Sequence, residues 1–259
     1  MCIRDRYIIY LFILTLAIGC KTTEPIATSS QVATPAFSAN ISKVFEAHGG
    51  LDQWANMKSL SYEIVKEGQN EKQFIDLSNR NERIEGANFI SGYDGTNYWL
   101  EADTTYRGNV KFYKNLIFYF YAMPFVVADP GIHYDEVPAL VYDGISYPGI
   151  RISYDNGIGI SPKDEYFIHY DAKTHEMEWL GYTVTFRSQE KSKAIKWIRY
   201  DDWQNINGLK LPKSLAWYTL EENLPVEERN RREFVNIKLS ETAWPASTFA
   251  LTEGAEVVE

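Results

Sequence analysis

The feature that most constrains the fold is a period of two among the apolar residues, which recurs in short segments over most of the chain. In the first segment, Leu60, Tyr62 and Ile64 alternate with more polar neighbours. Such alternation turns one face of a β-strand toward a core and the other toward water. Turn signals such as Asp94-Gly95 and Asn207-Gly208 separate the segments. Because strands and helices do not alternate along the chain, the pattern predicts an antiparallel sheet or barrel.

The predicted strands fall into two groups, before and after an aromatic segment in the middle of the chain. The first group begins at Ser59 and continues with Gln73–Ser78, Glu82–Glu85, Phe89–Gly92 and Tyr98–Ala102. The second group comprises Ala139–Tyr142, Gly149–Tyr154, Tyr166–Tyr170, Met177–Phe186, Ile195–Tyr200, Leu211–Leu220 and Arg232–Leu239.

Two helices are predicted before the first strand. Ser38 or Asn40 can cap the first helix, and Gly49-Gly50 supplies a left-handed stop after it. Leu51–Met57 is predicted to be a short second helix, in which Trp54 is a packing anchor. The first helix is predicted because three apolar residues and a histidine recur with helical spacing, at Ile41, Val44, Phe45 and His48.

The segment Asn109–Met123, NVKFYKNLIFYFYAM, interrupts the strands with an almost continuous run of aromatic and aliphatic residues. Its spacing predicts one helix, which Pro124 and Pro130 end. A helix that is apolar around most of its circumference has to be covered by protein, by lipid or by a ligand. An ordinary core helix over one sheet face is therefore an open alternative to a lid. The residues on the predicted helical face are Phe112, Leu116, Tyr119, Phe120 and Met123.

The first twenty residues predict export and lipidation. After a basic start, Tyr7–Ile18 is an apolar run of 12 residues, shorter than the roughly 20 that cross a bilayer. The run ends in Leu-Ala-Ile-Gly-Cys, which looks like a bacterial lipobox with Cys20 as the lipidated residue; an ordinary secretory signal is the alternative. We expect a signal peptide over residues 1–19, a tether over 20–36, a folded domain over 37–240 and a tail over 241–259. The opening MCIRDR resembles a translated sequencing adapter.

Composition and the spacing of reactive residues argue against several classes of protein. The 26 basic and 35 acidic residues give a net charge of −9, which is opposite to what a nucleic-acid binder needs. Two cysteines cannot make a disulfide framework, and the four histidines lack metal-ligand spacing. Gly144–Pro148 comes nearest to a nucleophile elbow, but proline replaces its second glycine. We therefore expect no catalytic residue, no metal and no cofactor.

Several remaining titratable residues are expected to be structural. His48 ends a helix and is expected to cap its carbonyls. Asp201 and Asp202 are adjacent, and adjacent strand residues point to opposite faces, so they are not expected to act as a carboxylate pair. The mixed charges of Glu221–Glu233 are typical of a solvated edge or a hairpin tip.

A series of short motifs follows the predicted tether. In chain order they are His48-Gly49-Gly50, Tyr93–Trp99 (YDGTNYW), Tyr166–Asp171 (YFIHYD), Glu176–Trp179 (EMEW), Tyr200–Trp203 (YDDW) and Asn207–Pro212 (NGLKLP). With the lipobox and the aromatic segment, this order resembles the LolA/LolB-like superfamily of Gram-negative outer-membrane lipoproteins, and more closely an uncharacterised lipoprotein family within it. The resemblance covers roughly residues 37–239.

The resemblance implies a fold that is α+β and mostly β. A curved antiparallel sheet forms an open half-barrel, with an N-terminal helix and a mid-chain aromatic lid helix. Apolar side chains line the concave face of the sheet, where members of the superfamily bind acyl chains or other lipophilic groups. This chain departs from the pattern in its many phenylalanines and tyrosines in the lid region, which would fill the cup with its own rings.

The leading hypothesis is a non-enzymatic lipoprotein that binds an acyl chain or a lipid-like molecule in this cup. It would be anchored to the outer membrane through Cys20, with its domain on the periplasmic face. Burial of apolar surface would drive binding, at about 25 cal/mol per Å². Strand residues expected to line the cup are Tyr62, Ile64, Tyr98, Leu100, Ile150, Ile152, Tyr182, Val184 and Phe186. Residues expected to face them from the helix are Phe112, Leu116, Tyr119 and Phe120.

Two other hypotheses are open. The same fold can serve as an envelope scaffold, with a core filled by its own rings and an exposed apolar patch that binds a protein partner. A periplasmic hydrolase or lyase would use carboxylates or tyrosines from separate strands, which leave no spacing signature. A large apolar cavity beneath the aromatic segment favours the carrier, and its absence favours the scaffold. A pocket that joins two perturbed carboxylates favours the enzyme.

Overall fold

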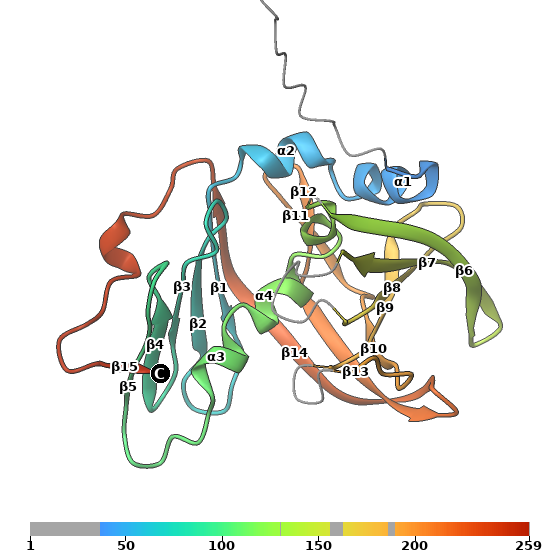
Figure 1. Cartoon of the computed structure of the whole chain (residues 1–259). Helices are drawn as coiled ribbons and strands as arrows, with labels where there is room; N and C mark the ends of the chain where they lie inside the picture. Colours follow the sequence, from blue (N-terminus) through green and yellow to red (C-terminus); the bar gives the residue numbers. More distant parts are fainter. Residues whose placement is uncertain (1–36, 130, 156–162, 186–189, 259) are drawn as a thin grey trace, which may run out of the picture. The chain divides into compact units, whose positions relative to one another are not determined.

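The computed structural model describes residues 37–129, 131–155, 163–185 and 190–258 (Figure 1). These residues belong to one compact unit, Ala36–Glu259. The predicted signal peptide, Cys20 and the tether lie outside the described residues, as does Phe186. Within the described ranges, every helix is too short or too polar to span a bilayer.

Two helices precede the sheet, as predicted: α1 (Ala39–Ala47) and α2 (Leu51–Asn56). Gly49 joins them with a φ of 105°, in the left-handed region that favours glycine. A Cβ at this position would lie 2.2 Å from the carbonyl oxygen of Gly208, so the site also requires a residue without a side chain. Trp54 packs on the body, as predicted, by stacking on an aromatic ring 4.7 Å away. The fully buried side chains of α1 are Ile41, Val44 and Phe45.

Thirteen strands of the described residues form one antiparallel sheet in the order β15-β5-β4-β3-β2-β1-β14-β13-β10-β9-β8-β7-β6. Because β15 and β6 are edges that do not pair with each other, the sheet is not closed into a barrel. The expected fold class, mostly β with a curved, open antiparallel sheet, is confirmed. The strands are β1 (Ser59–Ile64), β2 (Glu71–Asp76), β3 (Glu82–Glu85), β4 (Phe89–Tyr93), β5 (Tyr98–Ala102), β6 (Ile132–Tyr142), β7 (Ile145–Tyr154), β8 (Tyr166–Tyr170), β9 (Met177–Tyr182), β10 (Lys196–Arg199), β13 (Ser214–Glu221), β14 (Leu224–Ser240) and β15 (Glu256–Val258). A separate hairpin is formed by β11 (Trp203–Ile206) and β12 (Leu209–Pro212).

Most strands lie where the alternation predicts them, and the differences arise from pairing with residues that are distant in the sequence. The predicted strand Leu211–Leu220 is divided at Lys213, where the chain leaves the β11–β12 hairpin and enters the large sheet. The Lys213 carbonyl there accepts a hydrogen bond from the Phe234 N–H at 2.8 Å. β14 is longer than predicted because it pairs with β13 over its first half and with β1 over its second. Residues 256–258, expected to lie in a tail, pair with β5 as β15, so the folded body extends past residue 240.

The strand registers trace one face across the sheet, because directly paired residues of antiparallel strands share a face. Tyr62 on β1 shares its face with Gln73 on β2 and with Ile84 on β3. At the far end, Ile150 on β7 shares its face with Ile168 on β8. The main hydrophobic core lies on this face, around which the sheet curves, and we call it the concave face. The opposite face carries a smaller cluster of Leu140, Tyr147, Trp179 and Trp197.

The aromatic segment covers the concave face with three short helices rather than one (Figure 1). They are α3 (Val110–Tyr113), α4 (Leu116–Tyr121) and the 3₁₀ turn η1 (Phe125–Ala128). We call residues 110–128 the lid. The prediction of a single helix over Asn109–Met123 is wrong, because the chain breaks between α3 and α4.

The break lies at Asn115, which has a φ of 57° in the left-handed region. Asparagine tolerates this conformation better than most residues. The Asn115 backbone N–H donates to Oε2 of Glu82 at 2.9 Å, and Asn115 Nδ2 donates to the Arg80 carbonyl at 3.2 Å. Contacts with residues more than thirty positions earlier in the chain therefore hold the break.

Candidate functional site

Most strand residues that were predicted to line the cup share the concave face. Tyr98 and Leu100 are on this face of β5 and are half-buried. Val184 is exposed, because β9 ends at Tyr182 and the chain leaves the sheet before it, so the prediction that Val184 lines the cup is wrong. Buried on the concave face are Tyr62, Ile64, Ile150, Ile152 and Tyr182.

The break at Asn115 changes which lid side chains face the sheet. Phe120 is buried, as predicted, whereas Leu116 and Tyr119 are half-buried and pack against the core. Phe112 is 36% exposed, and the prediction that it faces the strands is wrong. One continuous helix would keep a single buried stripe, but the left-handed residue gives α4 a different direction from α3. The buried side chains of α4 are Ile117, Phe118, Phe120 and Tyr121.

One half of the concave face, on β7–β10 and β13, is apolar. Phe120 of the lid packs into it, with its ring centroid 4.8 Å from that of Tyr182 and 6.1 Å from that of Trp217. The Tyr200 hydroxyl donates to the Phe120 carbonyl at 2.6 Å. In this half the sheet therefore donates hydrogen bonds to the backbone of the lid. The inward side chains that define the apolar half are Ile150, Ile168, Leu180, Tyr182, Ile198, Tyr200, Leu215 and Trp217.

The other half, on β2–β5, carries polar side chains beside the apolar Ile75, Ile84 and Leu100, and we call it the polar half. Oε1 of Glu71 accepts hydrogen bonds from Nε2 of Gln73 at 2.8 Å and from the hydroxyl of Tyr113, on α3, at 2.7 Å. Gln73 in turn accepts a 2.6 Å hydrogen bond from the Tyr62 hydroxyl. In this half the lid donates hydrogen bonds to the sheet. The inward side chains that define the polar half are Glu71, Gln73, Glu82, Ser91, Tyr93 and Tyr98.

Glu82 is the most perturbed group of the polar half. It is 2% exposed, and burial raises the pKa of its carboxyl to about 8, against smaller lowering effects of the Asn115 N–H and the Lys114 charge. Oε2 accepts the Asn115 hydrogen bond, but Oε1 has no partner among the described residues. Oδ1 of Asn115 and the buried hydroxyl of Tyr121 also lack partners there. Because unpartnered buried polar atoms cost free energy, the lid covers this half at an energetic penalty.

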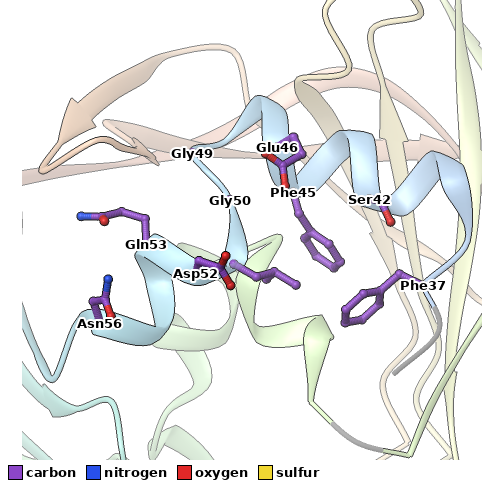
Figure 2. A pocket seen from close by; sticks show the side chains of 10 residues that line it. Phe37, Ser42, Phe45, Glu46, Gly49, Gly50, Asp52, Gln53 and Asn56 are labelled. Carbon is purple, nitrogen blue, oxygen red and sulfur yellow. The ribbon is translucent and has the colours of Figure 1, made fainter. Parts of the chain in front are cut away.

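Two of the surface pockets on the described residues lie away from the lid. One, of about 460 Å³, lies between α1 and α2, with the rings of Phe37 and Phe45 on one side and Gln53 and Asn56 on the other (Figure 2). The second, of about 410 Å³, lies against β1, β2 and β14. Neither contains Glu82 or any lid residue. The protein's own rings occupy the concave face, which is the arrangement that the sequence analysis linked to a scaffold.

His48 has the structural role that the sequence predicts. Its Nδ1 donates to the Val44 carbonyl at 2.7 Å, one helical turn earlier, and its Nε2 accepts the Met177 N–H at 3.4 Å. Burial lowers the pKa of the imidazole to about 4, so the ring is neutral at physiological pH. Within the described ranges, no group of three or more histidine, cysteine or acidic residues is arranged to hold a metal ion.

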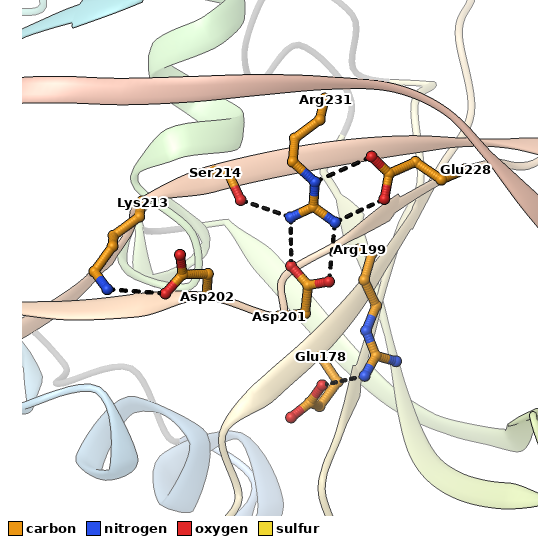
Figure 3. A network of polar contacts seen from close by, with 8 residues as sticks. All are labelled: Glu178, Arg199, Asp201, Asp202, Lys213, Ser214, Glu228 and Arg231. Atoms are coloured by element: carbon orange, nitrogen blue, oxygen red, sulfur yellow. Dashed lines mark hydrogen bonds and ion pairs between the residues drawn. The ribbon is translucent and has the colours of Figure 1, made fainter.

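Asp201 and Asp202 pair with different cations, but they lie in the link between β10 and β11 and not in a strand, so the alternation of strand residues is not the reason (Figure 3). Arg231 holds Asp201 through two hydrogen bonds of 2.7 and 3.0 Å, and it also contacts Glu228 at 2.7 Å. Asp202 pairs with Lys213 at 3.1 Å. The two carboxylates therefore do not form an acid–base pair, and the charged run after residue 221 belongs to a solvated hairpin.

The sequence analysis missed the polar half. In β2 the apolar Phe74 lies on the opposite face, where its ring packs 5.6 Å from that of Trp244. A search for alternating apolar residues therefore gives no clear inward face for this strand. A signal was present in the sequence. Glu71, Gln73 and the buried Ile75 occupy alternate positions of β2, so all three side chains lie on the same face of the strand.

The fold and the concave face define a class: a mostly β protein in which helices cover one side of an open, curved antiparallel sheet. Residues 98–227, half of the chain, match a family described as a family of unknown function, DUF6503. The chain belongs to this family. A comparison with curated proteins found no match.

Solved structures with some similarity include three bacterial proteins. A DUF1329 family protein from Desulfovibrio piger has a TM-score of 0.47 and 11% identity, over 82% of this chain and 98% of that chain. A LolA superfamily protein from Nitrosomonas europaea has a TM-score of 0.43 and 10% identity, over 75% and 89%. An outer membrane lipoprotein-sorting protein domain from Vibrio parahaemolyticus has a TM-score of 0.39 and 6% identity, over 76% and 93%. These values are too low to transfer a function, which is therefore argued from the concave face.

Proposed function

We propose that this protein is a non-enzymatic envelope lipoprotein that binds an acyl chain or another lipophilic molecule against the concave face of its half-barrel. The ligand takes the place of the lid on the apolar half. Candidate contacts on the strands are Tyr62, Ile64, Ile150, Ile152 and Tyr182, with Tyr98 and Leu100 at the margin. Candidate contacts on the lid are Leu116, Tyr119 and Phe120.

The construction of the lid is the observation that carries this proposal. α3 and α4 have 4 and 6 residues, well below the roughly 12–15 at which isolated helices become stable in water. Contacts with the sheet therefore hold the lid in place, and the closed lid buries unpartnered polar atoms of Glu82 and of its own Asn115 and Tyr121. Moving the lid hydrates these atoms and uncovers a continuous apolar surface without breaking any strand pairing.

The sequence supports a location in the bacterial envelope for this protein. The proposed anchor is the lipid on Cys20, with the domain on the periplasmic face of the outer membrane, in a lipoprotein family of the LolA/LolB-like type. The chain is acidic, with a net charge of −9, so an anionic membrane surface repels it and the acyl chains provide the attachment.

A scaffold with a self-filled core is the second candidate. It is favoured by the rings that fill the concave face and by exposed apolar side chains at two hairpin tips. Tyr142 connects these tips, because its hydroxyl donates to the Val226 carbonyl at 3.5 Å. The exposed apolar residues are Val141, Ile145, Leu220, Leu224 and Val226.

Binding of a fluorescent fatty alcohol, which carries no charged end group, separates the two candidates. The full chain is prepared with Cys20→Ser, so that it carries no lipid of its own, and is titrated with the probe. We expect saturable binding with one site, and native mass spectrometry should detect a lipid carried over from expression. Absence of both would contradict the carrier and favour the scaffold.

Asn115→Ala sharpens this test. It removes the hydrogen bond to Arg80 and places alanine at a positive φ in the closed lid, each at about 1 kcal/mol, so the probe should bind about thirtyfold more tightly. Asn236→Ala is the matched control, because Asn236 has a φ of 53° but is exposed on β14 and is not part of the lid. Equal changes of affinity in both variants would contradict the role of the lid.

A further inference from the structure

The lid contacts the polar half through hydrogen-bond donors that meet buried carboxyl groups. The Tyr113 hydroxyl donates to Glu71 at 2.7 Å, and the Asn115 N–H donates to Glu82 at 2.9 Å. The two glutamates are 7% and 2% exposed. A ligand that replaces the lid removes both donors from carboxyl groups that have little access to water.

Cations of the described residues do not satisfy these two carboxyls. Neither Glu71 nor Glu82 forms an ion pair among the described residues. Lys114 influences Glu82, but its Nζ lies 4.4 Å from the centroid of the Tyr93 ring, and it belongs to the lid and leaves with it. Arg232 reaches the concave face from β14, where its guanidinium lies 5.2 Å from the centroid of the Trp217 ring. It also interacts with the Tyr113 hydroxyl, but it forms no ion pair with Glu71 among the described residues.

We propose that the ligand of the concave face is an amphiphile with a primary ammonium end group. The ammonium replaces Tyr113 and Asn115 as the donor to Glu71 and Glu82, and the alkyl chain replaces Phe120 on the apolar half. This inference rests on the proposed function and adds the chemical class of the ligand to it.

The chemistry of the polar half distinguishes an ammonium from other end groups. Oε1 of Glu82 has no partner even when the lid is closed, so the lid leaves a buried polar atom of this half unsatisfied. An ammonium brings three donors and a positive charge, whereas a hydroxyl brings one donor and no charge. A carboxylate end group meets two acidic side chains and is disfavoured by like-charge repulsion.

The test uses three ligands with the same chain: dodecylamine, dodecanol and dodecanoate. Each is titrated below its micelle concentration into the full chain with Cys20→Ser, and affinity is measured by displacement of the fluorescent fatty alcohol and by calorimetry. We expect dodecylamine to bind at least tenfold more tightly than dodecanol, because charge-assisted hydrogen bonds in a buried site exceed neutral ones. Dodecanoate should bind most weakly.

Glu82→Gln should reduce the ratio of amine to alcohol affinity to within about threefold, since the amide keeps the shape but cannot ionise to pair with the ammonium. The matched control is Glu63→Gln. Glu63 is on the opposite face of β1, where its carboxylate lies 3.9 Å from Lys72, so its removal should leave the ratio unchanged.

The possible results separate the two proposals. Equal affinity for the amine and the alcohol would overturn the ammonium inference and leave the carrier function in place. Failure of all three ligands to bind would overturn the carrier function and this inference with it. The comparison of the three ligands on the otherwise unchanged chain decides the question even if Glu82→Gln does not fold.

Discussion

The two halves of the concave face hold the same lid by opposite means. In the apolar half, the sheet donates: the hydroxyls of Tyr200 and Tyr134 bond to the carbonyls of Phe120 and Val127, and the rings between them exclude water. In the polar half, the lid donates to carboxyl groups of the sheet. The apolar half therefore contributes stability through burial, and the polar half makes the position of the lid sensitive to protons and to charged ligands.

Removal of a ring from the apolar half should have the largest effect. Phe120→Ala leaves a cavity between Tyr182 and Trp217 and should lower the free energy of unfolding by about 3–5 kcal/mol, measured by urea denaturation. Phe112→Ala is the comparison, because Phe112 is 36% exposed whereas Phe120 is 6% exposed, so its loss of stability should be clearly smaller. Equal losses would contradict the assignment of the inward lid face.

A rise in pH from acidic to neutral should destabilise the polar half. The pKa of Glu82 is raised from 4.5 to about 8 in the folded state, so the folded chain binds the extra proton between these values and loses stability as pH rises through them. The loss should be about 3 kcal/mol between about pH 5 and pH 7.5, at 1.4 kcal/mol per pH unit. Glu82→Gln should remove this slope. If the pH dependence of stability is the same in the Glu82→Gln variant as in the wild type, it arises from another titratable group.

Acid should destabilise the opposite end of the molecule, where α1 packs on β9. The pKa of His48 is lowered from 6.5 to about 4, so the unfolded chain binds the extra proton in this range and stability falls as pH decreases. About 2 kcal/mol should be lost between about pH 6 and pH 4.5. His48→Gln should flatten the profile. His133→Gln should not, because His133 is exposed and pairs only with Asp155 on the surface.

Removal of a single hydrogen-bond donor between the lid and the sheet should have the smallest effect. Tyr113→Phe removes the hydroxyl that donates to Glu71 and should lower the free energy of unfolding by about 1 kcal/mol. It should also speed hydrogen exchange in α3 more than in β8 and β9. Tyr200→Phe removes a donor on the sheet and should speed exchange near the Phe120 carbonyl in α4 instead. If both variants loosened the same helix, the division of the face into two halves would be incorrect.

The sheet could be predicted from the sequence because its information is local. Alternation of apolar residues and turn pairs such as Asp94-Gly95 place most strands, and helical spacing places α1. The division of the strand at Lys213 was not predicted, because it depends on pairing with Phe234 twenty-one residues later. Register of this kind is a property of the folded chain and leaves no local pattern.

The candidate site could be predicted only in part, for the same reason. Apolar residues such as Ile150 and Tyr182 follow the alternation, and the sequence places them on the concave face. The break at Asn115 is held by Glu82 and Arg80 of another strand region, so the helical spacing of the aromatic segment could not reveal it. The carboxyls of the polar half were missed because charged residues at inward positions contradict the rule that the prediction used.

Hydrogen exchange across the lid, measured with and without dodecylamine, tests the central claim most directly. The account predicts that the bound amine makes the amides of residues 110–128 exchange faster, while those of β8, β9 and β13 stay protected, because the ligand takes the place of the lid on an intact sheet. Saturable binding of the amine with unchanged or increased protection of the lid would contradict it.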